Sequence, residues 1–292
     1  MLKRTLFFLT LNTLLVAGEP ELKKGLLERM IQPKLSYTTA YVSDAKVGES
    51  DGSVSVVKNS LRLNNKIASL TYNNWAFRWK NIADLPFGDG ANNPLKQMHG
   101  LNLSITFPYF INDDWFLLTS LSLKSTFEKE MKESYGGGVF SFASYKIDEK
   151  HTLQMGAFAN YHRVSSIALP VISYSYRARQ RDGFVLILGF PRAYMGYHIN
   201  ESLLLRSGMI FSQSVIKLSS QSPIESSGFI ESENYMGNIG AVYELNDSFT
   251  FEGDILYSLK REFILYDTQG EEHNSFDVKP SFGASFRLKY LF

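Results

Sequence analysis

The segment from residue 275 to residue 292, SFDVKPSFGASFRLKYLF, places an apolar residue at nearly every even position and a polar, charged or small residue at most odd positions. Successive side chains of a β-strand point to opposite faces, so this alternation predicts a strand with one apolar and one polar face. The same alternation runs through SFTFEGDILYSLK at 248–260 and LNLSITFPYFI at 101–111. Soluble strands average about five or six residues, whereas about nine to eleven tilted residues cross a bilayer. These segments therefore favour membrane-spanning strands.

The connections between such segments alternate between short polar turns and longer loops. Tight turns follow the even-numbered predicted strands, and longer loops follow most odd-numbered ones, which is typical of a transmembrane barrel with both termini at the short-turn rim. We therefore predict an all-β, antiparallel, up-and-down transmembrane barrel of fourteen strands. The predicted strands are 34–45, 53–64, 66–79, 98–111, 114–127, 136–147, 151–162, 168–179, 183–190, 192–199, 202–217, 228–245, 248–263 and 276–292.

The segment around Pro191 allows two strand counts. A proline cannot donate a hydrogen bond to a neighbouring strand, so Pro191 has to lie at a hairpin tip or at a bulge. If the two short segments that flank it are one kinked strand, an even strand number requires a second merger. The alternative prediction is then a barrel of twelve strands.

The amino terminus predicts export. Lys3 and Arg4 precede an apolar run that ends at small residues near Gly18, which is the pattern of a cleaved secretory signal peptide over residues 1–18. Residues 19–33 are predicted as a short periplasmic lead-in or helix, with a plug inside the barrel as the alternative, and residues 34–292 as the barrel. The chain contains no cysteine, so packing and hydrogen bonds alone hold the fold.

The end of the last predicted strand suggests a role in assembly. Phe292 follows Tyr290, Leu288 and Phe286 at two-residue steps, and this pattern resembles the carboxy-terminal signal of outer-membrane barrels. An extended segment with apolar side chains on one face can add to an exposed sheet edge. The resemblance implies the bacterial outer membrane, its lipid, the barrel-assembly machinery and periplasmic chaperones as location and partners, with both termini in the periplasm.

The central stretch ALPVISYSYRARQRDGFVLILGFPRAYMGYHINESLLLRSG contains Pro170, Tyr174, Gly189, Pro191 and Tyr197. It is similar to a family of uncharacterised, porin-like bacterial outer-membrane barrels with an L-P stretch and a G-F-P stretch around one tight turn. The resemblance implies a barrel without an assigned activity. It provides no catalytic residue.

Charged residues on the polar faces of the last two strands are the candidate functional residues. A basic residue facing lipid at the bilayer midplane costs about 2 to 4 kcal/mol, so these side chains are expected to face the lumen. Antiparallel pairing should bring Glu252 and Asp254 opposite Arg287 and Lys289. The predicted lumen-lining charges are Glu252, Asp254, Lys260, Lys279, Arg287 and Lys289. They either line a pore or form a salt-bridge ladder that fills the interior.

Motifs for enzymes, phosphate binding or metal binding are missing from the sequence, so we expect no catalytic residue, metal or cofactor. The 30 basic and 29 acidic residues give no sign of nucleic-acid binding. Trp75, Trp79, Trp115 and Tyr290 lie at strand ends and are predicted to belong to an interfacial aromatic belt. The expected function is a narrow porin-like channel for small hydrophilic solutes. The alternatives are a filled structural or surface-binding barrel and an outer-membrane hydrolase that uses His162.

Overall fold

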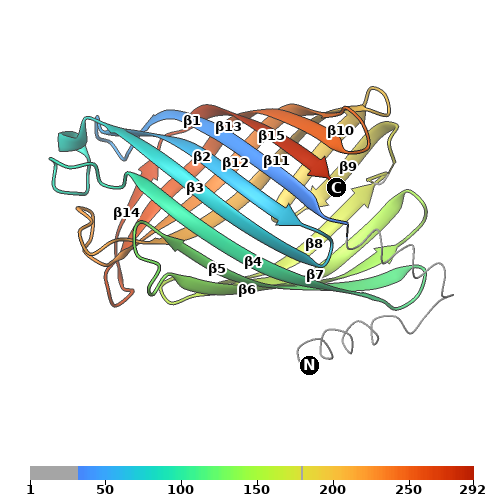
Figure 1. The fold of residues 1–292 in the computed structure, drawn as a ribbon, viewed down its shortest axis with the longest axis horizontal. Coiled ribbons are helices and arrows are strands. Elements are labelled where there is room, and N and C mark those ends of the chain that lie inside the picture. The colour runs from blue at the N-terminus through green and yellow to red at the C-terminus, as the bar shows by residue number, and fades with distance from the viewer. Residues whose placement is uncertain (1–31, 179) are drawn as a thin grey trace.

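The computed structural model describes residues 32–178 and 180–292, which form a closed antiparallel β-barrel (Figure 1). The predicted signal peptide, and the predicted lead-in up to residue 31, lie outside the described residues. The strands are β1 (Lys34–Lys46), β2 (Ser53–Asn64), β3 (Ala68–Lys80), β4 (Gln97–Phe110), β5 (Trp115–Phe127), β6 (Tyr135–Lys146), β7 (His151–His162), β8 (Ile167–Tyr176), β9 (Gly183–Gly189), β10 (Arg192–His198), β11 (Leu203–Lys217), β12 (Phe229–Glu244), β13 (Phe249–Tyr266), β14 (Glu272–Val278) and β15 (Ser281–Leu291).

The barrel has fourteen positions around its wall. Each strand from β1 to β13 pairs with its neighbour in sequence, and β15 closes the barrel by pairing with both β1 and β13. β14 lies beyond β15 against the same edge of β13, so the two share one position. The prediction of fourteen strands is confirmed, and the alternative of twelve is wrong.

The last predicted strand differs from its prediction in one respect. It starts at Glu272 rather than residue 276, and it is interrupted at Lys279 and Pro280, between β14 and β15. Pro280 has no backbone N–H with which to continue the ladder. The preceding strand, β13, extends to Tyr266 instead of ending at residue 263, so the loop between β13 and β14 is shorter than predicted.

Five of the six turns at one rim begin with an Asn or Asp side chain that accepts two backbone N–H bonds. Asn112, for example, accepts from the N–H groups of Asp114 at 3.0 Å and Trp115 at 2.8 Å. Such turns form locally from the sequence, because the side-chain oxygen replaces a backbone acceptor. The other four begin at Asn65, Asp148, Asn200 and Asn246.

The opposite rim carries the longer loops. In Figure 1 the short turns and the carboxy terminus lie at the right, and the loop that holds the 3-10 helix η1 (Ile82–Asp84) lies at the left. Phe190 and Pro191 form the tip of the hairpin between β9 and β10, as one reading of Pro191 predicted. At the short-turn rim the Gln32 Nε2 donates to the Phe292 carbonyl at 2.9 Å, so the two ends of the described barrel meet there.

The outer face of the barrel is apolar. Large hydrophobic side chains stay exposed at alternate positions, for example Leu101, Leu103 and Ile105 on β4. Exposed apolar surface of this extent requires an apolar environment rather than water. Within the part of the chain that the structure describes, no helix is both long and apolar enough to cross a membrane.

The buried core lies inside the barrel at the loop rim, and we call it the apolar cap. Its members come from β1 to β4, from β11 to β14 and from the long loops; they are Ala45, Val47, Val54, Val56, Phe77, Trp79, Phe87, Leu95, Met98, Ile216, Leu218, Ile230, Phe263, Leu265 and Val278.

Two tryptophans predicted for the interfacial belt belong to this interior instead. Trp79 is a buried member of the cap, and Trp75 packs against it. Tyr72 on β3 and its cross-strand partner Leu61 on β2 are both exposed on the outer face. Because side chains alternate along a strand, the odd positions of β3, including Trp75 and Trp79, face inward. The belt prediction is therefore wrong for Trp75 and Trp79.

Candidate functional site

The register separates the inner wall of the barrel into two unlike halves. In the half nearer the loop rim, β4 to β7 place mostly small or amide side chains inward, namely Asn102, Ser104, Ser120, Ser122, Gly136, Gly138 and Asn160. Toward the short-turn rim the inward side chains are larger and apolar, namely Phe116, Leu118, Phe140, Phe142 and Phe158. The opposite half, formed by β11, β12, β13, β15, β1 and β2, carries long charged side chains inward. The free space in the lumen toward the loop rim therefore lies beside β4 to β7, and the charged side chains lie on the opposite wall.

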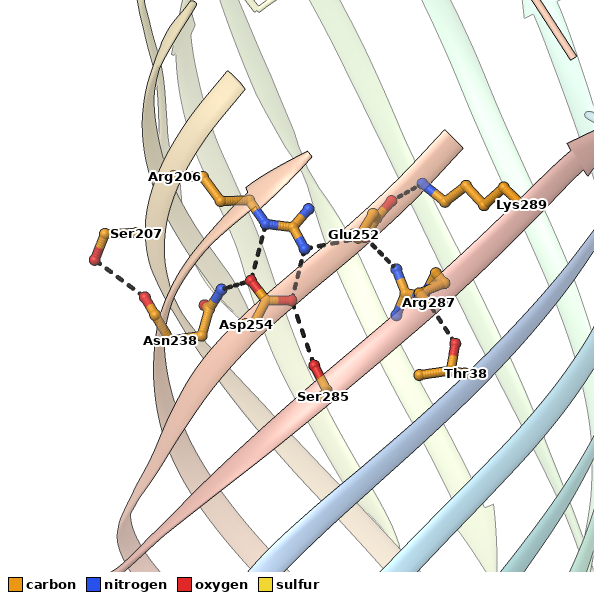
Figure 2. Close-up of polar contacts among 9 residues, drawn as sticks. All are labelled: Thr38, Arg206, Ser207, Asn238, Glu252, Asp254, Ser285, Arg287 and Lys289. Carbon is orange, nitrogen blue, oxygen red and sulfur yellow. Dashed lines mark hydrogen bonds and ion pairs between the residues drawn. The ribbon is translucent and has the colours of Figure 1, made fainter. Parts of the chain in front are cut away.

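Arg206 on β11 is the centre of an ion-pair network on the charged half (Figure 2). Its Nε donates to Asp254 Oδ1 at 3.1 Å, and its Nη2 donates to Asp254 Oδ2 at 2.7 Å. Asn238 on β12, between the two strands, donates its amide to the same Asp254 Oδ1 at 2.8 Å. A guanidinium that binds both carboxylate oxygens is held in a fixed orientation.

Glu252 extends this network toward β15 and β1. It accepts from Arg206 Nη2 at 3.0 Å and from Arg287 Nη1 at 3.1 Å, and Lys289 contacts its second oxygen. Arg287 in turn donates through Nε to Thr38 Oγ1 on β1 at 2.8 Å. The Glu252 side chain is only 2% exposed, so its charge depends on these three cations rather than on bulk water.

Four of the six predicted lumen charges meet in this network, and two lie elsewhere. Lys260 follows a bulge in the pairing of β12 with β13; it is opposite Tyr235 and pairs with Glu262. The bulge moves Lys260 to the opposite face from Asp254. Lys279 lies at the loop rim between β14 and β15 and pairs with Glu49.

Arg206 was missed from the sequence, although a signal for it exists. It is the one charged residue within the apolar alternating stretch LLLRSGMIF at 203–211. A charge in such a stretch is expected to face the lumen. Its acidic partners are on β13, two strands away, and the sequence alone does not pair β11 with them.

The predicted assembly residues lie on the outer side of β15 or directly after it. Phe286 is exposed and contacts Phe251, with ring centroids 6.2 Å apart. Leu288 is opposite Phe251 and Tyr37 in the register. Tyr290 packs against Phe249 and Phe292, at 4.8 Å and 4.9 Å between centroids.

The ends of β11 and β12 lean across the mouth of the barrel at the loop rim. Lys217 at the end of β11 forms a parallel bridge with Phe127 at the end of β5, across the barrel. Gln213 and Glu231 both contact Ser165 in the loop after β7. The apolar cap and this crossing close part of the mouth.

A polar cavity of about 220 Å³ remains between the crossing end of β11 and the inner side of β4 to β7. Lys124 lies in its wall and donates to Asn160 Oδ1 at 3.0 Å. Asn102 Oδ1 and His162 Nε2 are buried beside it, without a hydrogen-bond partner among the described residues. The cavity thus offers both donors and acceptors.

Within the described residues, the ring of His162, the one residue considered for hydrolysis, forms no hydrogen bond or ion pair with a carboxylate or with a serine hydroxyl, and Ser166 donates only to the backbone carbonyl of His162. Its ring packs edge-on against Phe229, with centroids 5.5 Å apart, and its Nδ1 accepts from the Val164 N–H at 3.4 Å. Among the residues that the structure describes, no three His, Asp or Glu side chains gather closely enough to hold a metal ion.

No family model matches the sequence, and no curated protein matches it. Several solved structures resemble the fold. The KdgM porin is 8% identical, with 89% of this chain and 99% of that chain covered and a TM-score of 0.37. The NanC porin is 7% identical, with 88% of this chain and 99% of that chain covered and a TM-score of 0.41. An outer membrane channel from Pseudomonas putida F1 is 10% identical, with 90% of this chain and 96% of that chain covered and a TM-score of 0.47. Because these TM-scores are low, the fold assignment is based on the strand pairing and not on the similarity to these structures.

Proposed function

We propose that this protein is a bacterial outer-membrane, porin-like channel for small hydrophilic solutes. The observation that supports the proposal is the division of the barrel wall into an apolar outer face and an inner face that carries an ion-pair network on one side and small polar groups on the other side toward the loop rim. A closed barrel with an apolar band outside and a polar interior is the form in which strands cross an outer membrane.

The path that we propose runs beside β4 to β7. Small inward side chains leave room there toward the loop rim, where the polar cavity lies on the same side, and the inward phenylalanines of β5 to β7 narrow the path toward the short-turn rim. The apolar cap occupies the other side of the mouth. Solutes would therefore pass between small polar groups on one side and the ion-pair network on the other, which favours a narrow channel.

Filling the cavity at the mouth is expected to block this path. Asn102→Trp places a large ring at an inward position that lines the cavity, so single-channel conductance in a planar bilayer should fall to a small part of the parent value. Leu103→Trp is the matched control, because Leu103 is exposed on the outer face and the added ring would enter lipid. If both variants conduct like the parent protein, the path does not run beside β4.

The apolar cap supports a second candidate, a filled barrel with a structural or surface-binding role. Several cap residues are fully buried, including Val47, Val54 and Leu218 at 0% exposure. A barrel closed in this way conducts no ions. Steady unitary steps from the parent protein support the channel, and an electrically silent protein that is folded in the bilayer supports the filled barrel.

We also propose that the short-turn rim faces the periplasm. In outer-membrane barrels the short turns are periplasmic and the longer loops extracellular. The residues from Phe286 to Phe292 would then have served as the assembly signal before β15 paired with β1. Protease added outside intact cells should cut the loop at 81–96 and spare the turn at 199–202.

A further inference from the structure

Arg261 is a buried cation that has no counterion among the residues the structure describes. It lies on β13 directly below the apolar cap, and its side chain is 3% exposed. Its Nε and Nη2 have no hydrogen-bond partner within the described residues, and it forms no ion pair with a described carboxylate. Its register partners are Asn234 and Val278, which bring no negative charge. A buried guanidinium without a partner is strongly unfavourable, so this position needs an anion.

A second cation at the edge of the apolar cap has no ion pair with a described carboxylate. Lys58 on β2 faces inward and is only partly exposed, and its ammonium lies over the Trp75 ring, 4.0 Å from the centroid. Trp75 packs against the apolar cap, so Lys58 lies at the same boundary between cap and lumen as Arg261. Two like charges at one boundary repel each other unless an anion lies between them.

The side chain of Ser281 adds a hydrogen-bond donor to the surroundings of Arg261. Ser281 on β15 faces the same side of the wall, is buried, and has an Oγ without a partner among the described residues. It is opposite Ser258, three residues before Arg261 along β13. The nearest buried carboxylate in the register is Glu231 on β12, three residues from Asn234, and its oxygens already accept from Ser165, Gln213 and Tyr266. Asp254 and Glu252, farther along β13, are bound by Arg206. The local excess of positive charge is therefore not neutralised by the ion-pair network.

We propose that Arg261 and Lys58 form a binding site for a small oxyanion, of the phosphate or carboxylate class, at the inner boundary of the apolar cap. Guanidinium and ammonium groups with a nearby hydroxyl are the donors that such anions prefer. The site deepens the proposed function, because it names oxyanions as the solute class, and it rests on that function for the route by which the anion enters.

Binding of inorganic phosphate to the full chain, refolded in detergent, tests the site. Phosphate should bind, and should raise the thermal unfolding midpoint relative to chloride at equal ionic strength. Loss of a hydrogen bond to a charged group corresponds to about a tenfold or greater loss of affinity, so Arg261→Gln should weaken phosphate binding by about that factor. Lys58→Gln should weaken it in the same direction. The control is Lys279→Gln, which removes an exposed lysine at the loop rim and should bind like the parent.

Stability without phosphate gives an independent readout. Arg261→Gln removes an uncompensated charge, so in phosphate-free buffer this variant should be at least as stable as the parent, and the added stability from phosphate should vanish. The site is refuted if phosphate does not bind the parent, or binds Arg261→Gln and Lys58→Gln as tightly. A silent bilayer recording with intact phosphate binding contradicts the channel but not the site, and conduction without phosphate binding contradicts the site but not the channel.

Discussion

Replacing Arg206 with alanine is expected to destabilise the folded barrel by about 3–5 kcal/mol, the cost of breaking a buried ion pair by removing one partner. Arg206 provides three of the hydrogen bonds to Asp254 and Glu252, whose side chains are 10% and 2% exposed. Without it, Asp254 keeps only the neutral donors Asn238 and Ser285. The measurement is the free energy of unfolding from urea titrations in detergent, followed by circular dichroism.

Arg181→Ala is the matched control for this prediction. Arg181 forms an ion pair with Glu244 at the short-turn rim, and both side chains are substantially exposed. Exposed pairs contribute about 0–1 kcal/mol, so this variant should unfold close to the parent. Glu252 keeps Arg287 and Lys289, so Asp254 is the stranded charge, and adding Asp254→Asn to Arg206→Ala should restore much of the lost stability. Equal losses in Arg206→Ala and Arg181→Ala would show that the network is not buried in the folded protein.

Replacing Trp79 with alanine should cost about 3–5 kcal/mol, the usual cost of truncating a buried tryptophan or phenylalanine. Its ring contacts Phe87 edge-on at 5.6 Å and Phe263 at 6.3 Å between centroids, and its Nε1 donates to the Leu95 carbonyl at 2.7 Å. Truncation leaves a cavity and an unpaired carbonyl at the centre of the apolar cap. Urea titration of the refolded variant measures the loss.

Trp115→Ala separates a buried tryptophan from one on the outer surface. Trp115 lies at the short-turn rim, partly exposed, and stacks on Tyr145 with centroids 4.7 Å apart. Because this ring is not part of the interior packing, its removal should cost clearly less than removal of Trp79. A Trp115 variant as unstable as the Trp79 variant would mean that the apolar cap does not hold the loop rim together.

The strands and their order could be predicted because their signals are local. Period-two alternation defined the two faces, and the Asn or Asp at each tight turn marked the strand ends. The bounds of β2 and β7 agree with the prediction at both ends. The interruption at Pro280 was not predicted, although a proline within a strand is a known reason for a break.

The direction of each face could not always be predicted. On β3 both faces are apolar, with Leu70 and Tyr72 outside and Trp75 and Trp79 inside, so hydrophobicity alone does not identify the lipid side. The inner face is apolar there only because the loop at 81–96 and the ends of β11 to β13 pack into the mouth.

The candidate site shows the same limit. Glu252 and Arg287 are opposite each other as predicted, because pairing between neighbouring strands follows from the register, whereas Asp254 is opposite Ser285 and Lys289 is opposite Thr250. Lys260 does not face the lumen because a bulge in the pairing of β12 with β13 reverses its direction, and no residue in the sequence indicates this bulge. Arg206 joined the site through contacts across three strands, and such contacts depend on the curvature of the closed wall.

The account depends on one claim, that alternate side chains of each strand face lipid and the others face the lumen. The chain has no cysteine, so single cysteines can carry nitroxide labels without background. Labels along β4, in protein reconstituted into lipid bilayers, should alternate in their collisions with oxygen and with a polar relaxation agent. Positions 101, 103 and 105 should favour oxygen, and positions 102, 104 and 106 should favour the polar agent or be shielded from both. Equal access to the polar agent at all six positions would contradict a membrane-spanning barrel.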